Sequence, residues 1–243
     1  KLKEYSFRIL KEECLDLPDK VYTKRMVELT DEQKIVYDNL KKYALALIEE
    51  GSITPSTMLT QILRLQQICS GHVKLDDGEL KHFKTNKLVE LDNVTDEIRG
   101  KVIIWANFTQ DIKSIVKLLH DKYGPDSVVS YYGETPSEVR QEIVEEFQDL
   151  QSRVRFFVGQ PRTGGYGLTL TSARTVIYYS NGYDLEVRLQ SEDRAHRIGQ
   201  VNKVTYIDII TEKTVDEKIL KALRSKIDIS SQVLSEDYKQ WII

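Results

Sequence analysis

Two arginines and a glutamine near the C-terminal end carry the clearest chemical signal in this sequence. Gln190, Arg194 and Arg197 stand at offsets of zero, four and seven residues. On a helix, where each residue turns by about 100°, these offsets fall within about 60° of one face. A guanidinium is a rigid fork of donors that keeps its charge, and two of them one turn apart can hold a triphosphate during transfer. The spacing therefore predicts arginine fingers for ATP hydrolysis on one face of a helix.

The same arginines are also common on a solvated helix surface. Glu192 and Asp193 lie beside them in the sequence and can neutralise them in an exposed ion-pair cluster, which contributes little to stability. The arginine pair alone does not decide between a catalytic and a surface role, so the neighbouring motifs must.

Alternating strand and helix patterns after residue 95 predict a parallel α/β sheet that positions these residues. Apolar and β-branched runs predict strands at 101–106, 127–132, 153–158, 175–180 and 204–210. Amphipathic segments predict helices at 112–123, 136–150 and 216–226. Ligands of such sheets bind beyond the carboxyl ends of the strands. The motifs of this chain follow strands or open helices, as a site at that edge requires.

The first 94 residues have a different pattern. An alternating strand is expected at 21–29, followed by a capping box at Thr30–Gln33 that begins a helix ending near Gly51. A second helix is expected from about Pro55 to Gly71, and then a loop at 71–86. The predicted organisation is a connector with a helical protrusion, a sheet lobe and a tail, over residues 1–94, 95–226 and 227–243.

A glycine-rich segment, residues 159–168, follows the third strand of the lobe. It superficially resembles a phosphate loop, but Gly165 stands where lysine is required and no Ser or Thr follows to hold magnesium. Gly164, Gly165 and Gly167 would still let the backbone approach a ribose, a phosphate or a DNA strand closely. A tight turn that binds nothing is the alternative, and the segment alone does not separate the two.

The composition limits the classes of protein that are possible. The chain has 243 residues, 30% charged and 40% hydrophobic, with a net charge of −3. This excludes a wholly basic nucleic-acid coat but allows a local basic groove. No apolar run approaches the length of a membrane span, and no secretory signal is present, so an intracellular location is expected.

No metal site is predicted from the residues of this chain. Cys14 and Cys69 form no CxxC pair, and His72 is a single neighbour rather than a ligand set. Two acidic pairs, Asp31–Glu32 and Asp96–Glu97, do not follow apolar strands as a magnesium-binding pair would.

Together these motifs resemble the second RecA-like lobe of the Swi/Snf-type DNA translocases, within helicase superfamily two. The resemblance spans nearly the whole chain. It rests on ordered stretches at residues 7–20, 30–37, 63–69, 104–109 (motif four), 132–147 (Gly133, Arg140 and Phe147), 162–171 (motif five) and 190–200 (motif six). The stretch Arg194-Ala195-His196-Arg197-Ile198-Gly199-Gln200 is the most specific of these.

The resemblance implies a motor with ATP and Mg²⁺ held between two RecA-like lobes. The phosphate loop and the magnesium aspartate belong to the N-terminal lobe, so this chain is expected to be inactive alone. Arg194 and Arg197 would act across the cleft as fingers, worth about 10³–10⁵ in rate. Gln190 would orient the γ-phosphate or the attacking water, and the backbone at Gly165 and Gly167 would contact the nucleotide.

The resemblance also implies two partners, the N-terminal lobe of the same motor and double-stranded DNA. The DNA contacts would be mainly to backbone phosphates, without base reading. The implied contact residues are Asn107, Thr109, Gly133, Arg140, Arg162, Thr163 and Gly164. The location would then be DNA-associated, in the nucleoid or, in a eukaryote, in the nucleus.

Two positions and one short run depart from the family pattern. Thr169 replaces the usual asparagine of motif five, and Pro161 replaces the threonine before Arg162. Residues 180–184 replace the usual Asp-Trp-Asn-Pro run. These departures indicate a divergent branch, so a chromatin substrate does not follow.

Other functions stay open at this point. One alternative is a non-catalytic DNA- or partner-binding module, and another is the lobe of a strand-separating helicase. A glycosyltransferase half-domain fits poorly, because it leaves Gln190, Arg194 and Arg197 unexplained.

Overall fold

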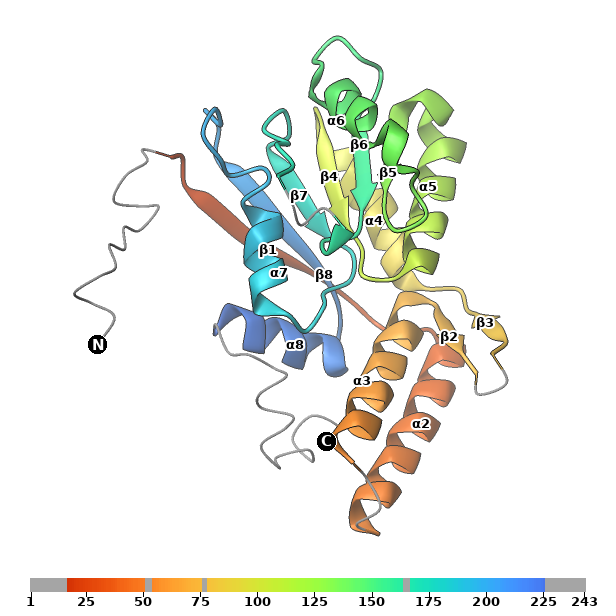
Figure 1. Ribbon diagram of the computed structural model, residues 1–243. Coiled ribbons are helices and arrows are strands. Elements are labelled where there is room, and N and C mark those ends of the chain that lie inside the picture. The colour runs from red at the N-terminus through yellow and green to blue at the C-terminus, as the bar shows by residue number, and fades with distance from the viewer. Residues whose placement is uncertain (1–16, 51–53, 76–77, 164–166, 226–243) are drawn as a thin grey trace, which may run out of the picture.

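The structure is a computed structural model that describes residues 17–50, 54–75, 78–163 and 167–225. Its centre is a six-stranded sheet in which every strand pair is parallel, in the order β1-β8-β7-β4-β6-β5 (Figure 1). The strands are β1 (Lys20–Val27), β4 (Val102–Trp105), β5 (Val128–Tyr131), β6 (Phe156–Gly159), β7 (Thr175–Tyr178) and β8 (Val204–Thr211). The predicted parallel α/β fold is confirmed.

The central strands are buried on both faces, which explains why they read as continuous apolar runs. Alternate residues of β4 enter different cores: Val102 and Ile104 pack on one side, Ile103 and Trp105 on the other. The first core is covered by α4 (Asn86–Glu97) and α5 (Thr109–Tyr123). The second is covered by α6 (Arg140–Gln148), through Phe147, and by the segment that follows α7 (Leu185–Glu192), through Ala195.

The strand expected near the N-terminus belongs to this sheet. β1 pairs with β8 along its whole length, from Lys20 opposite Val204 to Val27 opposite Thr211. The sheet of the lobe therefore takes one edge strand from the first 94 residues. A pairing between segments so far apart in the sequence leaves no local pattern, so the sequence predicts the strand without predicting its neighbour.

The two predicted N-terminal helices form a hairpin that projects from the sheet (Figure 1). They are α2 (Asp31–Glu49) and α3 (Pro55–Ser70). The predicted capping box is present, because the Thr30 side chain accepts from the Gln33 backbone and Gln33 binds back to the Thr30 backbone. Gly71 ends α3 with a φ of 97°, a left-handed conformation that favours glycine. The hairpin has its own apolar core, which it shares with α8 (Val215–Arg224).

The segment expected as a loop at 71–86 contains a small antiparallel hairpin, so this expectation was wrong. β2 (His72–Lys74) pairs with β3 (Leu80–His82). Strands of three residues are too short to show a clear alternation, so no apolar pattern in the sequence marks them.

A buried polar cluster joins the β2–β3 hairpin to the sheet. The Ser180 hydroxyl donates to the Asp111 carboxylate at 2.7 Å and accepts from the Asn107 backbone N–H at 2.8 Å. His72, from β2, lies with Nδ1 3.4 Å from the other oxygen of Asp111. Burial raises the pKa of Asp111 to about 7 and lowers the pKa of His72 to about 4. At neutral pH His72 is therefore neutral, and the two side chains are not an ion pair.

Gly159, the last residue of β6, is expected to tolerate no side chain. A Cβ there would lie 2.7 Å from the Tyr131 carbonyl oxygen and 3.1 Å from the Trp105 ring. Gly159→Ala should therefore lower the free energy of unfolding by about 1–3 kcal/mol in urea titrations followed by circular dichroism. Gly133→Ala is the matched control, because a Cβ there meets nothing within 4 Å. Equal midpoints for the two variants would contradict this account.

Asp111 should make the stability of the fold depend on pH. Its folded-state pKa of about 7 lies above the ordinary value of 3.8, so the folded chain binds the proton more tightly than the unfolded chain does. Its contribution to stability is present below pH 3.8 and is lost as the pH rises through about 7. Asp111→Asn should therefore reduce the loss of stability over this range and make the chain more stable at pH 8, by roughly 1–3 kcal/mol.

Urea titrations of the parent and of Asp111→Asn from pH 4 to pH 8 measure this difference. Other titrating groups are common to both chains, so the difference between the two curves isolates Asp111. Parallel curves would show that Asp111 keeps an ordinary pKa in the folded chain.

Candidate functional site

Four strands of the sheet end in one row, and this row defines the candidate site. Gly159 of β6 lies opposite both Tyr131 of β5 and Trp105 of β4, and Trp105 lies opposite Tyr178 of β7. The loops after these strands therefore begin at the same level of the sheet. They bring together four of the predicted DNA contacts from three separate parts of the chain: Asn107, Gly133, Arg162 and Thr163.

One glutamine connects the three loops that carry these residues. The Oε1 atom of Gln160 accepts from the Gly133 backbone N–H at 3.4 Å and from the Thr163 hydroxyl at 3.3 Å. Its Nε2 atom donates to the Asn107 carbonyl at 3.3 Å. Gln160 was not predicted as a site residue, because nothing in its local sequence indicates that its partners converge from three loops.

Arg140 and Thr109 lie at the edges of this loop cluster. The Arg140 guanidinium donates to the Thr135 carbonyl at 3.1 Å and to the Tyr132 carbonyl at 3.5 Å. It also lies 5.3 Å from the centre of the Tyr131 ring, so it holds the loop after β5 in place. Thr109 is the first residue of α5. DNA contacts by these two residues stay predictions.

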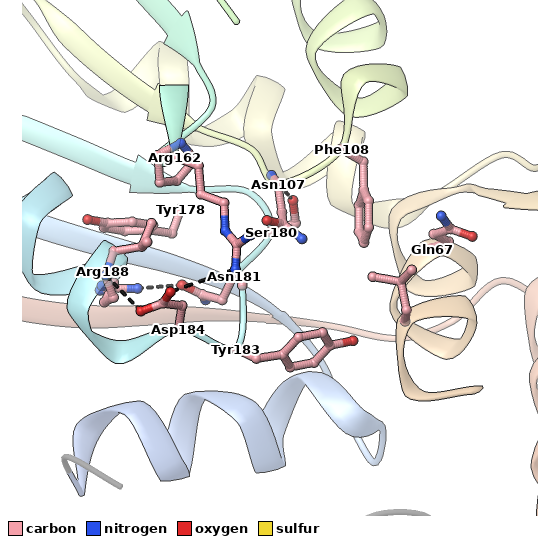
Figure 2. A pocket seen from close by; sticks show the side chains of 14 residues that line it. Gln67, Asn107, Phe108, Arg162, Tyr178, Ser180, Asn181, Tyr183, Asp184 and Arg188 are labelled. Atoms are coloured by element: carbon pink, nitrogen blue, oxygen red, sulfur yellow. Dashed lines mark hydrogen bonds and ion pairs between the residues drawn. The ribbon is translucent and has the colours of Figure 1, made fainter. Parts of the chain in front are cut away.

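A pocket of about 350 Å³ lies between α3 and the loops after β4, β6 and β7 (Figure 2). Arg162 reaches into it from an exposed position, and its Nη2 lies 3.7 Å from an Asp184 carboxylate oxygen. Asp184 also caps α7 by accepting from the Val187 backbone N–H at 3.1 Å. Tyr183 points toward α3 across the pocket, with Phe108 on the wall above it (Figure 2). The pocket therefore combines one exposed cation with aromatic and amide surfaces.

The three residues of the arginine motif do not share a helical face, which corrects the sequence prediction. α7 ends at Glu192, and the Gln190 side chain donates along the helix to Glu186 at 2.9 Å. Arg194 and Arg197 follow in a series of turns, where Arg194 is buried and Arg197 is exposed.

Long-range hydrogen bonds explain why the helix stops. The buried Gln200 amide donates to three carbonyls, of Thr171 at 3.1 Å, Ala173 at 3.0 Å and Ala195 at 3.2 Å. In addition, the Leu170 backbone N–H donates to the Arg194 carbonyl at 2.9 Å. These bonds tie the arginine segment to residues 170–173, just after the glycine-rich segment, and a continuing helix would not allow them.

The two arginines lie close to each other and to the glycine-rich segment. Burial lowers the pKa of Arg194, and the nearby charge of Arg197 lowers it further. Arg197 donates from Nη1 to the Leu168 carbonyl at 3.4 Å, next to Gly167, which has a φ of 80°. Both guanidinium groups keep their charge, so an anion placed between them would relieve their repulsion. Gly164 and Gly165 lie outside the described residues.

A buried charge network fixes α7, which leads into the arginine segment. The Arg188 guanidinium lies 2.6 Å from a carboxylate oxygen of Asp208 in β8 and 3.0 Å from one of Glu192. Its central carbon lies 3.4 Å from the centre of the Tyr178 ring, on which it stacks. Tyr22 of β1 donates to the other Glu192 oxygen at 2.6 Å. This network was not predicted, although an acidic residue inside the apolar strand 204–210 was a usable signal.

Among the described residues, no group of three or more His, Cys, Asp or Glu side chains is arranged to hold a metal ion. No helix within the described ranges is long and apolar enough to cross a membrane.

Comparison with known proteins identifies the family. The helicase conserved C-terminal domain matches residues 84–199. The SWI/SNF chromatin-remodeling complex subunit snf22 of Schizosaccharomyces pombe is 28% identical over 96% of this chain, which covers 15% of that protein. The putative ATP-dependent helicase/translocase YwqA of Bacillus subtilis is 31% identical over 95% of the chain and is covered to 25%.

A solved structure agrees with these matches. The SWI2/SNF2 ATPase core of Sulfolobus solfataricus in complex with dsDNA has a TM-score of 0.73 and 27% identity, over 95% of this chain and 51% of that one. The chain thus spans at most about half the length of these relatives. On this evidence the chain carries the helicase conserved C-terminal domain, and it corresponds in sequence and fold to the C-terminal RecA-like lobe of the Swi/Snf-type ATPases.

Proposed function

We propose that this chain is the C-terminal motor lobe of an ATP-dependent double-stranded DNA translocase or remodeller. In this proposal it supplies arginine fingers to ATP hydrolysis and backbone contacts to DNA. The observation that carries the proposal is the position of the arginine segment. Arg194 and Arg197 are tied to residues 168–170 through the Leu170–Arg194 and Arg197–Leu168 hydrogen bonds, beside the glycine-rich segment.

The residues of this chain fit one side of a nucleotide site. Two neighbouring guanidinium groups, one of them exposed, suit the γ-phosphate oxygens of ATP, whose hydrolysis supplies the free energy of the motor. Arg194 and Arg197 would neutralise the charge that develops there, and the backbone at Gly165 and Gly167 would approach the nucleotide. Gln190 would have to exchange its bond to Glu186 for the γ-phosphate or the attacking water, and this bond is exposed and therefore easily broken.

The other half of the site belongs to the N-terminal lobe in this proposal. The phosphate loop is missing from this sequence, because Gly165 stands where its lysine is required. We therefore assign the phosphate loop and the Mg²⁺ ligands to the N-terminal lobe, and we expect no hydrolysis by this chain alone.

The loop cluster at the row of strand ends is the proposed DNA surface. Asn107, Arg162 and the backbone of the loops would contact phosphates, while Gly133 would let a strand approach because no side chain covers it. Such contacts position the duplex without reading bases. The solved SWI2/SNF2 ATPase core of Sulfolobus solfataricus in complex with dsDNA, 27% identical to this chain, supports this assignment. An intracellular, DNA-associated location follows from the same proposal.

Removing Arg197 should abolish ATP turnover by the complete motor. The 243-residue chain should release no phosphate above a blank, whereas the chain with its N-terminal lobe should show DNA-stimulated turnover. Arg197→Ala in the complete motor should lower that turnover by about 10³-fold or more, because the transition-state charge loses its partner. Arg153→Ala is the control. Arg153 is an exposed arginine just before β6, at the amino end of the strand and so away from the row of carboxyl ends.

Either of two results would contradict this account. The first is turnover by the 243-residue chain that Arg197→Ala removes. The second is DNA binding without turnover by both forms, which would favour a non-catalytic binding module.

Arg162 should contribute one phosphate contact to DNA binding. Arg162→Ala should weaken the binding of duplexes of different sequence to a similar extent, measured by fluorescence anisotropy. It should also reduce the slope of log Kd against log salt by about one. Arg174→Ala, an exposed arginine just before β7, should leave affinity and slope unchanged. A loss confined to one sequence, or an unchanged slope, would contradict a phosphate contact.

A further inference from the structure

We propose that Gln160 is a positioning residue, which sets the spacing of the three loops that face DNA. This inference rests on the proposed DNA-binding function. It adds a residue that the motif pattern of the sequence does not single out.

Backbone contacts hold Gln160 in place independently of its side chain. It follows Gly159, whose missing side chain lets β6 approach the Tyr131 carbonyl closely. The Gln160 backbone N–H donates to that same carbonyl at 3.1 Å. The side chain therefore starts from a constrained point between the ends of β4 and β5.

The polarity of its partners selects a neutral amide. The Gly133 backbone N–H can only donate, so the atom facing it must be the amide oxygen, which also accepts from the Thr163 hydroxyl. The Asn107 carbonyl can only accept, so the amide nitrogen must face it. A carboxylate could not donate to Asn107, and a lysine or arginine could not accept from Gly133.

The consequence for binding is a fixed distance between phosphate contacts. Gln160 engages backbone or hydroxyl groups of the loops rather than the Asn107 side chain or the Arg162 guanidinium. Arg162 is exposed and lies 3.7 Å from Asp184, an ion pair that a DNA phosphate would replace. Asn107 and Arg162 lie on different loops, so they can contact neighbouring phosphates together only if the loops keep their separation. Without the amide, each loop could still bind a phosphate, but ordering the loops would then oppose binding.

The test replaces Gln160 by an isosteric side chain that forms no such hydrogen bonds. Gln160→Met keeps the length and volume, and Gln160→Ala serves as a second variant that removes the whole side chain. The matched control is Gln148→Met. Gln148, the last residue of α6, also bridges two segments, donating to the Thr171 hydroxyl at 3.2 Å and accepting from the Ser172 N–H at 3.0 Å. These partners directly precede β7, so Gln148 lies away from the row of strand ends that faces DNA.

Three measurements on the 243-residue chain are compared: duplex affinity over a range of salt, amide hydrogen exchange at Gly133, and the thermal midpoint. We expect Gln160→Met to weaken duplex binding about tenfold and to reduce the salt slope by about one. Exchange at Gly133 should become faster, because its acceptor is lost. Gln148→Met should lower the thermal midpoint at least as much as Gln160→Met does. It should nevertheless keep the duplex affinity, the salt slope and the Gly133 exchange rate of the parent.

Several results would overturn the inference. Equal or tighter duplex binding by Gln160→Met with an unchanged slope would show that the amide does not position the DNA contacts. Unchanged exchange at Gly133 would show that it does not hold the loops, and this measurement needs no DNA. A parent chain that binds no duplex would instead refute the proposed function, which separates the two failures.

Discussion

The site depends on the register of the parallel sheet. Because Tyr131, Gly159, Trp105 and Tyr178 lie opposite one another, four loops leave the sheet at one level. In a parallel sheet the carboxyl ends of all strands lie on the same side, because each connection returns the chain to the opposite side, usually through a helix. A slip of one residue in any of these strands would move its loop out of the row and turn its apolar residues to the wrong core. The requirement for a glycine at 159 shows how closely these strand ends pack.

A buried ion pair between α7 and the sheet orients that helix. Arg188 and Asp208 are both buried, and burying such a pair seldom adds stability compared with apolar residues of similar size. The pair instead specifies how α7 lies on β7 and β8, while Tyr22 and Lys20 connect the same network to the edge strand through Glu192. The direction in which the chain leaves α7 toward the arginine segment follows from this orientation.

The helical hairpin is coupled to the lobe through polar groups as well as apolar ones. The buried Gln66 amide of α3 donates to the Asn181 carbonyl at 2.9 Å, and the Tyr37 hydroxyl of α2 accepts from the Val215 backbone N–H, at the start of α8, at 2.9 Å. The Asp111–Ser180 contact connects to the Asn107 backbone, so the position of one proposed DNA contact depends on groups next to the hairpin. The division of the chain at residue 94 remains an expectation from composition. In the structure, β1 pairs with β8 in the sheet of the lobe and α4, which spans residue 94, packs on one face of that sheet.

The sequence by itself determined most of the elements and the order of the motifs, because these depend on local patterns. The short strands β2 and β3 and the helix α4 were not predicted. Apolar alternation, the capping box at Thr30 and the glycine at 71 act over a few residues, and the structure has the predicted strands and helices there. Tertiary structure decided what depends on distant partners. The helical spacing of Arg194 and Arg197 was overridden by hydrogen bonds to residues 168–173, more than twenty positions away. The convergence of three loops on Gln160 likewise exists only once the strands are paired, because no sequence window contains all its partners.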